Sequence, residues 1–185
     1  MTILSKHSIR QEILNLRQAL GEDEQKYKSN LIYQSIINDE YFIKAPVLLV
    51  YLSTKYEVST TSLIKKAWEL GKTVAAPKVN GGVMDFYVFS SFNQLKVGPF
   101  YGILEPTTTE PIQTKDALII MPGVAFDYQR NRIGYGKGYY DRYLSEHPDY
   151  ETIALSFDCQ LLKKIPSEEH DLKPNKIITE TGIIK

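Results

Sequence analysis

Apolar residues near the start of the chain recur every three or four positions. A first run consists of Ile9, Ile13, Leu16 and Leu20 behind Ser8, and a second of Leu31, Ile32 and Ile36 behind Glu22, Asp23 and Glu24. Side chains at this spacing share one face of an α-helix. Two helices are therefore expected before Pro46, which ends this section of the chain.

After Pro46, short apolar runs alternate with a helical segment. VLLVYL at 47–52 and TVAAPKV at 73–79 have the composition of buried strands. Between them, TTSLIKKAWELG at 60–71 has helical spacing, with threonine at its start and glycine at its end. This order of strand, helix and strand predicts a βαβ unit within a parallel sheet.

The rest of the chain continues the alternation. VMDFYVF at 83–89 follows the turn-forming pair Gly81-Gly82 and suits a strand antiparallel to its predecessor, whereas the polar stretch 90–115 is expected to be irregular. Further strands are predicted in ALIIMPG at 117–123, ETIALSF at 151–157 and, as a pair, KIITETGIIK at 176–185, with helical pieces from about Tyr139 to Ser145 and around Leu161. The pattern predicts one domain over residues 1–185, a three-layer α/β/α sandwich with a mostly parallel central sheet.

Composition narrows the class of protein. The chain has 185 residues, 43% of them apolar, which is enough for one continuous core. Lysine and arginine total 22, as do aspartate and glutamate, so the net charge gives no reason to expect nucleic acid or an acidic membrane as partner. Any attraction for anions must therefore be local.

Cysteine usage and hydropathy favour a soluble, cytoplasmic protein. Cys159 is the only cysteine, which excludes an intrachain disulfide, and it is more typical of a structural thiol than of a nucleophile. The N-terminus is charged within six residues, so we expect no signal peptide, and VLLVYL is far shorter than the ~20 residues of a membrane helix. His7, His147 and His170 are expected to be surface or structural residues.

One segment concentrates glycine, tyrosine and cations. RNRIGYGKGYYDRYL, from Arg130 to Leu144, follows the predicted strand ALIIMPG, and ligands of open α/β sheets bind beyond the carboxyl ends of the strands. Gly134, Gly136 and Gly138 allow successive backbone N–H groups to converge just before a helix N-terminus, which favours an anion there.

Cations surround these glycines. Lys137 supplies a mobile charge, and Arg132 and Arg142 supply planar forks that match phosphate oxygens. The segment is not a Walker A loop, because Lys137 is followed by Gly138 rather than by serine or threonine. It indicates a polyphosphate cradle, although the glycines alone are equally typical of a turn with solvated cations.

Asp141 lies just inside the predicted helix. A carboxylate at this position can hold Mg²⁺ that bridges nucleotide phosphates. It can also serve only to stabilise the helix N-terminus through the helix dipole. The residues by themselves leave both roles open.

The longest motif carries a resemblance to a known family. MPGVAFDYQRNRIGYGKGYYDRYL, at 121–144, closely resembles the signature of the 5-formyltetrahydrofolate cyclo-ligases. The similarity extends to Lys6 and Arg10 at the start, YLSTKYEVST at 51–60, GPFYGILEP at 98–106 and the late Pro166-to-Asp171 segment. Two departures are Tyr101, a modest variation, and Asn175, which stands where many relatives carry aspartate.

The resemblance implies an activity and a fold. Such enzymes use ATP and Mg²⁺ to convert 5-formyltetrahydrofolate into 5,10-methenyltetrahydrofolate, releasing ADP and phosphate. The implied mechanism is phosphoryl transfer to the formyl oxygen, ring closure by N10 and loss of phosphate. The implied fold is a Rossmann-like sandwich of the kind found in CoA transferases, acting as a monomer without nucleic-acid or membrane partners.

The resemblance also implies site residues, several with more than one role. The implied ATP contacts are Lys6, His7, Ser8, Ile9, Arg10, Arg132, Gly134, Tyr135, Gly136, Lys137, Gly138, Tyr139, Tyr140 and Asp141. The implied folate contacts are Leu52, Glu57, Tyr135, Gly136, Lys137, Gly138 and Tyr139. Lys137, Arg132 and Tyr140 are the implied catalytic residues, and Asp141 and Asp171 the implied metal ligands.

Two other classes use similar residues. An RNA-binding module could use the basic and aromatic strip at 130–142 for stacking and phosphate contacts, but zero net charge and the carboxylates of Asp141 and Asp171 count against it. A sugar-phosphate or CoA-dependent enzyme on a related scaffold is supported by fold analogy alone.

Overall fold

The computed structural model describes residues 5–99, 102–168 and 171–185. Two residues singled out in the sequence, Tyr101 and His170, lie outside these ranges.

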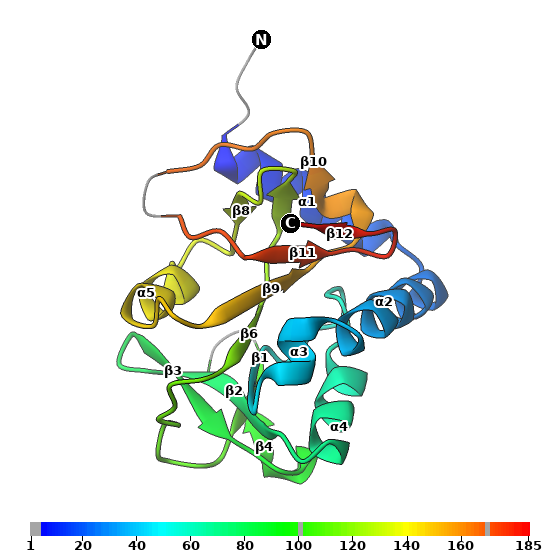
Figure 1. Cartoon of the computed structure of the whole chain (residues 1–185). Helices are drawn as coiled ribbons and strands as arrows, with labels where there is room; N and C mark the ends of the chain where they lie inside the picture. Colours follow the sequence, from blue (N-terminus) through cyan, green and yellow to red (C-terminus); the bar gives the residue numbers. More distant parts are fainter. Residues whose placement is uncertain (1–4, 100–101, 169–170) are drawn as a thin grey trace.

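A seven-stranded sheet forms the centre of the protein, in the order β12-β11-β9-β6-β1-β2-β3 (Figure 1). Its strands are β1 (Val47–Val50), β2 (Thr73–Asn80), β3 (Val83–Val88), β6 (Leu118–Met121), β9 (Glu151–Leu155), β11 (Lys176–Ile178) and β12 (Ile183–Ile184). The five inner strands pair in parallel, and β3 and β12 are antiparallel at the two edges. The predicted mostly parallel sheet and its antiparallel edge strands are confirmed.

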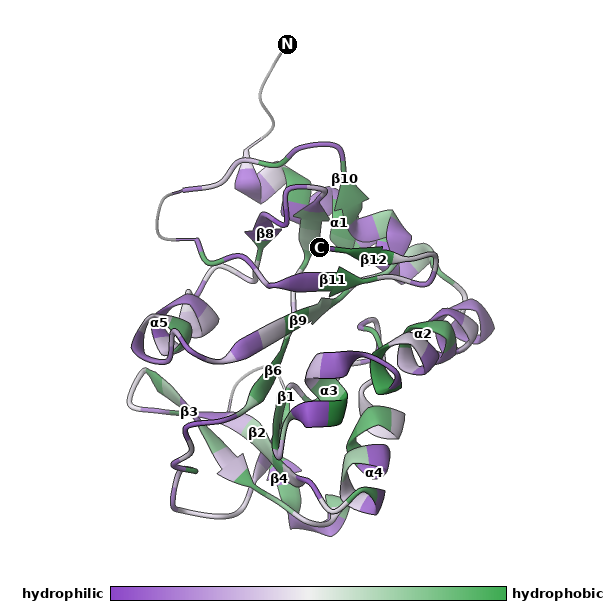
Figure 2. Ribbon diagram, in the orientation of Figure 1, coloured by the Kyte–Doolittle hydropathy of each residue, from purple (hydrophilic) through white to green (hydrophobic). Residues whose placement is uncertain are grey.

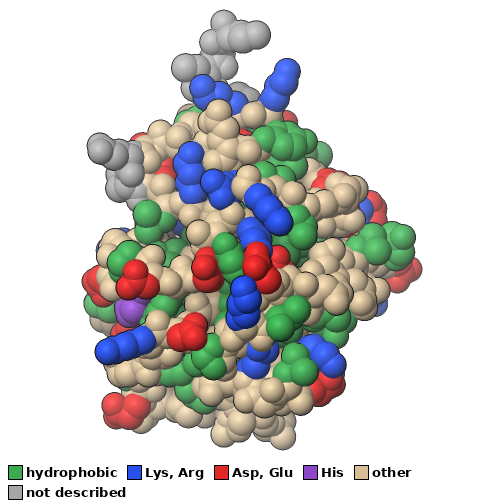
Figure 3. All heavy atoms as spheres, in the orientation of Figure 1, with side chains coloured by type: hydrophobic (Ala, Val, Ile, Leu, Met, Phe, Trp, Pro, Cys, Tyr) green, Lys and Arg blue, Asp and Glu red, His purple; other side chains and the backbone are tan. Residues whose placement is uncertain are grey.

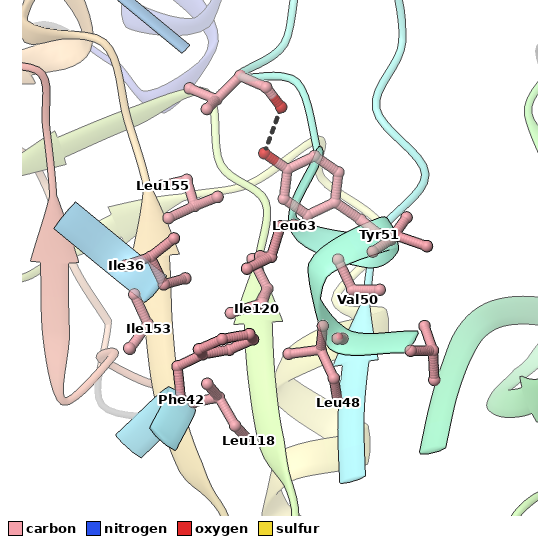
Figure 4. Close-up of a cluster of buried hydrophobic side chains, with 14 of the residues drawn as sticks. Ile36, Phe42, Leu48, Val50, Tyr51, Leu63, Leu118, Ile120, Ile153 and Leu155 are labelled. Carbon is pink, nitrogen blue, oxygen red and sulfur yellow. Dashed lines mark hydrogen bonds between the residues drawn. The ribbon is translucent and has the colours of Figure 1, made fainter. Parts of the chain in front are cut away.

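Helices cover both faces of this sheet. They are α2 (Glu22–Ile37), α3 (Glu40–Lys44) and α4 (Thr61–Glu69) on one face and α5 (Tyr139–Glu146) on the other (Figure 1). Alternate residues of each strand point to opposite faces, so Leu48 and Val50 pack towards α2–α4, whereas Leu49 packs towards α5. Figure 4 shows the first of these clusters, in which Phe42 of α3 and Leu63 of α4 lie against the strands. In Figure 2 the inner strands of the central sheet are largely apolar, whereas the helices carry many polar residues.

The two ends of α4, the helix of the βαβ unit, are formed by Thr60 and Gly71. Thr60 occupies the N-cap position of α4, but its hydroxyl donates to the carbonyl of Tyr51 instead of capping the helix. At the other end, Gly71 has φ +71°, and the N–H groups of Gly71 and Lys72 bond to the carbonyls of Trp68 and Ala67. These bonds form a Schellman motif, which needs a left-handed residue and therefore favours glycine.

The first helix, α1 (Lys6–Ala19), packs away from the central sheet. It covers a three-stranded sheet of β10 (Leu161–Leu162), β7 (Ala125–Asp127) and β8 (Arg132–Ile133), where its Ile9 and Ile13 join a separate apolar cluster. The helix begins earlier than expected, because Ser5 rather than Ser8 is its N-cap. Its buried face also differs from the expected one: Leu16 is 44% exposed, whereas Arg17 is 3% exposed.

Short elements account for the remaining differences from the predicted pattern. The stretch expected to be irregular contains a 3-10 turn, η1 (Phe92–Gln94), and a small antiparallel pair, β4 (Leu95–Val97) and β5 (Leu104–Pro106). The helical piece expected around Leu161 is a 3-10 turn, η2 (Asp158–Gln160), and Leu161 itself begins β10.

The surface agrees with the balanced charge of the chain. On the face shown in Figure 3, acidic and basic side chains are interspersed, and Lys and Arg gather towards the end of the molecule where α1 lies. Within the described ranges, no helix combines the length and the hydropathy that crossing a membrane requires. Burial raises the pKa of the Cys159 thiol, which keeps it protonated and agrees with a structural role.

Candidate active site

Three segments far apart in sequence meet at one end of the central sheet. The strands β1 and β6 are parallel neighbours, so the loops that follow them leave the sheet on the same side. The loop after β1 contains Glu57, and the chain after β6 leads through the small sheet to residues 134–138, here called the glycine loop. Helix α1 joins them, because Arg10 Nε donates to the carbonyl of Gly134 at 2.7 Å.

The glycine loop is shaped by two positive backbone angles and by surrounding guanidinium groups. Gly136 has φ +93°, and Gly138 has φ +64° at the N-cap of α5, a left-handed geometry that other residues adopt only with strain. A Cβ on Gly134 would lie 2.9 Å from Arg132 Nη1, and one on Gly138 would lie 3.0 Å from Arg142 Nη1. The glycines therefore allow cations to approach the loop backbone, as expected of a site for phosphate groups.

Five residues at the start of α1 were predicted to contact ATP, and the side chains of two of them, Lys6 and Arg10, bond to segments of the candidate site. Lys6 Nζ donates to Asp171 at 2.6 Å and lies 2.9 Å from Glu168. Burial lowers the pKa of Lys6, but these hydrogen bonds outweigh it, and the pKa lies above its usual value. Arg10 reaches the glycine loop as described above.

The other three predicted residues of α1 make no hydrogen bond to the glycine loop among the described residues. His7 is exposed, the Ser8 hydroxyl bonds to Ser5 at the start of the helix, and Ile9 is buried in the α1 cluster. Ser8 and Ile9 thus make their described contacts within α1 and its apolar cluster, and all three ATP contacts stay predictions.

The two predicted metal ligands lie on segments that contact each other. Asp141 Oδ1 accepts from Arg132 Nη2 at 2.8 Å and from the backbone N–H of Leu172, the residue after Asp171, at 3.0 Å. Arg132 is buried behind Asp141, with its side chain 5% exposed. The Arg132 guanidinium was expected from the sequence to face phosphate oxygens, and its ion pair with Asp141 was not predicted.

The donor set suits Mg²⁺ only with help from a ligand. In the described part of the chain, no group of three or more His, Cys, Asp or Glu side chains could hold a metal ion by itself. Mg²⁺ typically binds one or two carboxylates together with substrate phosphates and waters. Asp141 fits this pattern, because its second oxygen, Oδ2, accepts no hydrogen bond from the described residues.

Glu57 is held in place by three donors. Its Oε2 accepts from the backbone N–H and the hydroxyl of Thr54 at 2.8 and 2.9 Å, and its Oε1 accepts from the Tyr135 hydroxyl at 2.6 Å. Burial raises the pKa of Tyr135, and the charge of Glu57 raises it further, so the phenol stays protonated and donates. Leu52, the other predicted folate residue from this loop, is half-buried against the core.

The remaining predicted residues occupy distinct environments. Lys137 is exposed, and Tyr139 lies beneath Arg142, whose guanidinium carbon is 5.1 Å from the ring centroid. The Tyr140 hydroxyl is buried and has no hydrogen-bond partner among the described residues, and burial raises its pKa. A buried hydroxyl without a partner costs free energy, so Tyr140 stands out among the residues of this region.

Sequence reasoning missed Arg17 and left the role of Asn175 open. Arg17 continues the apolar spacing of Ile9 and Ile13 at i+4, which is an unusual position for a cation and is the signal that could have drawn attention to it. Asn175 Oδ1 accepts from the backbone N–H and the hydroxyl of Thr152, both at 2.7 Å. A neutral amide oxygen satisfies these donors, so Asn175 has a structural role where it stands.

Two surface hollows lie away from this region. One, of about 390 Å³, is lined by residues 114–115 and 146–150, and the other, of about 310 Å³, lies beside β12. Neither contains a residue predicted for the site. The convergence of side chains from three segments, rather than the size of a hollow, therefore locates the candidate site.

This fold and site define an α/β enzyme with a glycine loop suited to phosphate groups at the carboxyl end of a parallel sheet. The family model of the 5-formyltetrahydrofolate cyclo-ligases matches residues 2–180, and the chain belongs to this family.

Curated relatives and solved structures agree with this membership. The mouse 5-formyltetrahydrofolate cyclo-ligase is 30% identical over 190 residues, which cover 95% of this chain and 94% of the mouse protein. The enzyme of Escherichia coli strain K12 is 29% identical over 177 residues, covering 90% and 96%. The solved structure of Aquifex aeolicus 5,10-methenyltetrahydrofolate synthetase matches with a TM-score of 0.87 and 30% identity, covering 98% of this chain and 93% of that one.

Proposed function

We propose that this protein converts 5-formyltetrahydrofolate into 5,10-methenyltetrahydrofolate with ATP and Mg²⁺, releasing ADP and phosphate. Family membership supports the reaction. The observation that carries the assignment of residues is the hydrogen bond between Tyr135 of the glycine loop and Glu57. A nucleotide phosphate held by the loop and a pterin held by Glu57 would meet beside Lys137.

The chemistry explains why a phosphate site is needed. The oxygen of a formamide is a poor leaving group when N10 attacks the formyl carbon, whereas a phosphorylated oxygen leaves readily. We infer that the γ-phosphoryl group is transferred to the formyl oxygen, that N10 closes the ring, and that phosphate then departs. Catalysis of such a transfer consists mainly of positioning and charge stabilisation, and needs no covalent nucleophile from the protein.

Five charged residues of the site have a role in this scheme. Lys137 and the N–H groups of the glycine loop would stabilise the migrating phosphoryl group, with Arg10 supporting the loop. Asp141 and Asp171 would hold Mg²⁺ together with nucleotide phosphates, and the ion would neutralise phosphate charge. Arg132 would orient Asp141, because the two side chains are already bonded.

The reaction can be tested directly. Purified protein incubated with ATP, Mg²⁺ and 5-formyltetrahydrofolate should produce the ultraviolet absorbance of methenyltetrahydrofolate, with one phosphate released per product. Omission of ATP should abolish both signals. A protein that forms no methenyl product, but binds single-stranded RNA or turns over a sugar phosphate or a CoA ester, would instead support one of the other two classes.

Replacing Glu57 with glutamine should weaken folate binding selectively. A reduced pterin presents an N–H group and an amine side by side, and an ionised carboxylate accepts from both. Glutamine keeps the size but opposes an amide donor to one pterin donor, so the loss should be roughly 1–3 kcal/mol, the usual cost of an unpaired buried polar group. Calorimetry with each ligand separately should show weaker folate binding and nearly unchanged ATP binding.

The matched control for this variant is Glu69→Gln, at the exposed end of α4, which should leave both affinities unchanged. Folate affinity equal to that of the parent protein, or an equal loss for ATP, would show that Glu57 does not bind the pterin.

We further propose that the protein is a single-domain monomer of the cytoplasm, an expectation that rests on its size and its lone cysteine.

A further inference from the structure

Arg17 is a buried cation with an unusual set of partners. Its residue exposure is 3%, and no carboxylate of the described residues lies within ion-pair distance. Nη2 donates to the Tyr135 hydroxyl at 3.0 Å, Nη1 donates to the Gly123 carbonyl at 3.4 Å, and Nε has no partner in the described ranges. Burying a guanidinium is costly unless it is well bonded, so the bond to Tyr135 is its principal compensation.

The hydrogen bonds from Arg17 to Glu57 run in one direction. A guanidinium can only donate, so the Tyr135 oxygen must accept from Arg17 and its proton must point to Glu57. Glu57 carries a negative charge and forms no ion pair with a cation of the described residues. The Tyr135 hydroxyl lies between its carboxylate and the Arg17 guanidinium and bonds to both. Arg17, Tyr135 and Glu57 therefore form a bridge from α1 through the glycine loop to the loop after β1.

The bridge is a second anchor of the glycine loop, next to the hydrogen bond from Arg10 to the Gly134 carbonyl. Tyr135 lies between Gly134 and Gly136, two residues that do little to stiffen the backbone. Tyr135 itself is 48% exposed. Part of Tyr135 is therefore open to solvent, and the hydrogen bonds on both sides of its hydroxyl help to hold the side chain in place. Only Gly136 separates Tyr135 from Lys137, so we expect the anchoring of Tyr135 to influence where Lys137 lies.

The bridge leaves Glu57 able to take a ligand. A carboxylate has about four lone-pair sites, and the Thr54 N–H and the Tyr135 hydroxyl use two of them. The Thr54 hydroxyl uses a third, but it can rotate away. Two sites then remain for two neighbouring donors, while the other two bonds fix the plane of the carboxylate.

We propose that Arg17 is a positioning residue, which holds the glycine loop against Glu57 through the Tyr135 hydroxyl and so couples folate binding to the placement of Lys137. This inference rests on the proposed function. It assigns Arg17 no contact with either substrate.

A double-mutant cycle tests the bridge. Arg17→Met and Tyr135→Phe should each raise the KM for 5-formyltetrahydrofolate and its calorimetric Kd by about tenfold and lower kcat, since each removes the same link to a charged group. The double variant should be no worse than either single variant, because the two residues act as one unit. Arg17→Lys, which keeps a donor, should recover part of the loss.

The structural control is Ile13→Val, one turn earlier on the buried face of α1. It should lower Tm by about 2–4 °C without changing the KM for folate. Two results, obtained with an active parent enzyme, would contradict the proposed role of Arg17. One is that the effects of Arg17→Met and Tyr135→Phe on folate affinity multiply in the double variant, and the other is that these variants change Tm without changing folate affinity. A parent protein that formed no methenyl product would instead overturn the proposed function.

Discussion

Lys137→Ala is expected to lower kcat by roughly 10²–10³-fold, the effect of removing one preorganised charge contact from a transition state. Lys137 lies between two glycines in left-handed geometry, at the point where the glycine loop meets the N-terminus of α5. In phosphoryl transfer, negative charge spreads over the oxygens of the moving group, and a fixed cation stabilises it there. Folate binding should weaken less than turnover.

The variant should fold normally, because Lys137 is exposed and makes no ion pair within the described structure. Steady-state kinetics of Lys137→Ala should therefore be compared with those of Lys65→Ala, an exposed lysine on α4 that should behave as the parent does. A kcat of Lys137→Ala within twofold of the parent value would show that the lysine is not at the reacting phosphoryl group.

Asp141→Asn should change both the metal requirement and the stability of the enzyme. The amide keeps the shape and can still accept from Arg132 and from Leu172, but it lacks the charge that would hold Mg²⁺. We expect activity to fall and the Mg²⁺ concentration at half-maximal activity to rise roughly tenfold or more, which corresponds to about 1.4 kcal/mol.

A loss of stability should accompany this change. Arg132 is almost fully buried, and Asp141 is its carboxylate partner, so neutralising Asp141 leaves a buried charge with a weaker acceptor. The cost is expected to be about 1–3 kcal/mol, measured by denaturant unfolding. Asp149→Asn, an exposed aspartate beyond α5, is the control for both measurements. An unchanged magnesium titration would leave Asp141 only its role beside Arg132 and at the helix N-terminus.

Much of the fold could be predicted because its signals are local. The apolar run Val47–Leu52, the helical spacing at 60–71 and the pair Gly81-Gly82 each specify an element from neighbouring residues, and these elements are present. Strands of two or three residues, such as β4 and β10, contain too few positions to show a period, so they were missed. The packing of α1 on the small sheet depends on topology, which a single helix does not encode.

In the candidate site too, local features could be predicted from the sequence and long-range contacts could not. The glycine loop is contiguous, so its residues could be identified from one motif. The bonds that join Arg17 and Glu57 to Tyr135 link positions 118 and 78 residues apart, and such pairs are fixed only when the whole sheet is assembled. The burial of Arg132 behind Asp141 likewise follows from the position of β8, which the local pattern did not indicate.

The most direct test of the proposed reaction follows the formyl oxygen. 5-Formyltetrahydrofolate labelled at this oxygen with a heavy isotope should be converted with ATP and Mg²⁺, and the released phosphate analysed by mass spectrometry. Transfer of the phosphoryl group to the formyl oxygen predicts one labelled oxygen in the phosphate for each methenyltetrahydrofolate formed. Unlabelled phosphate, with the label released to water, would contradict it.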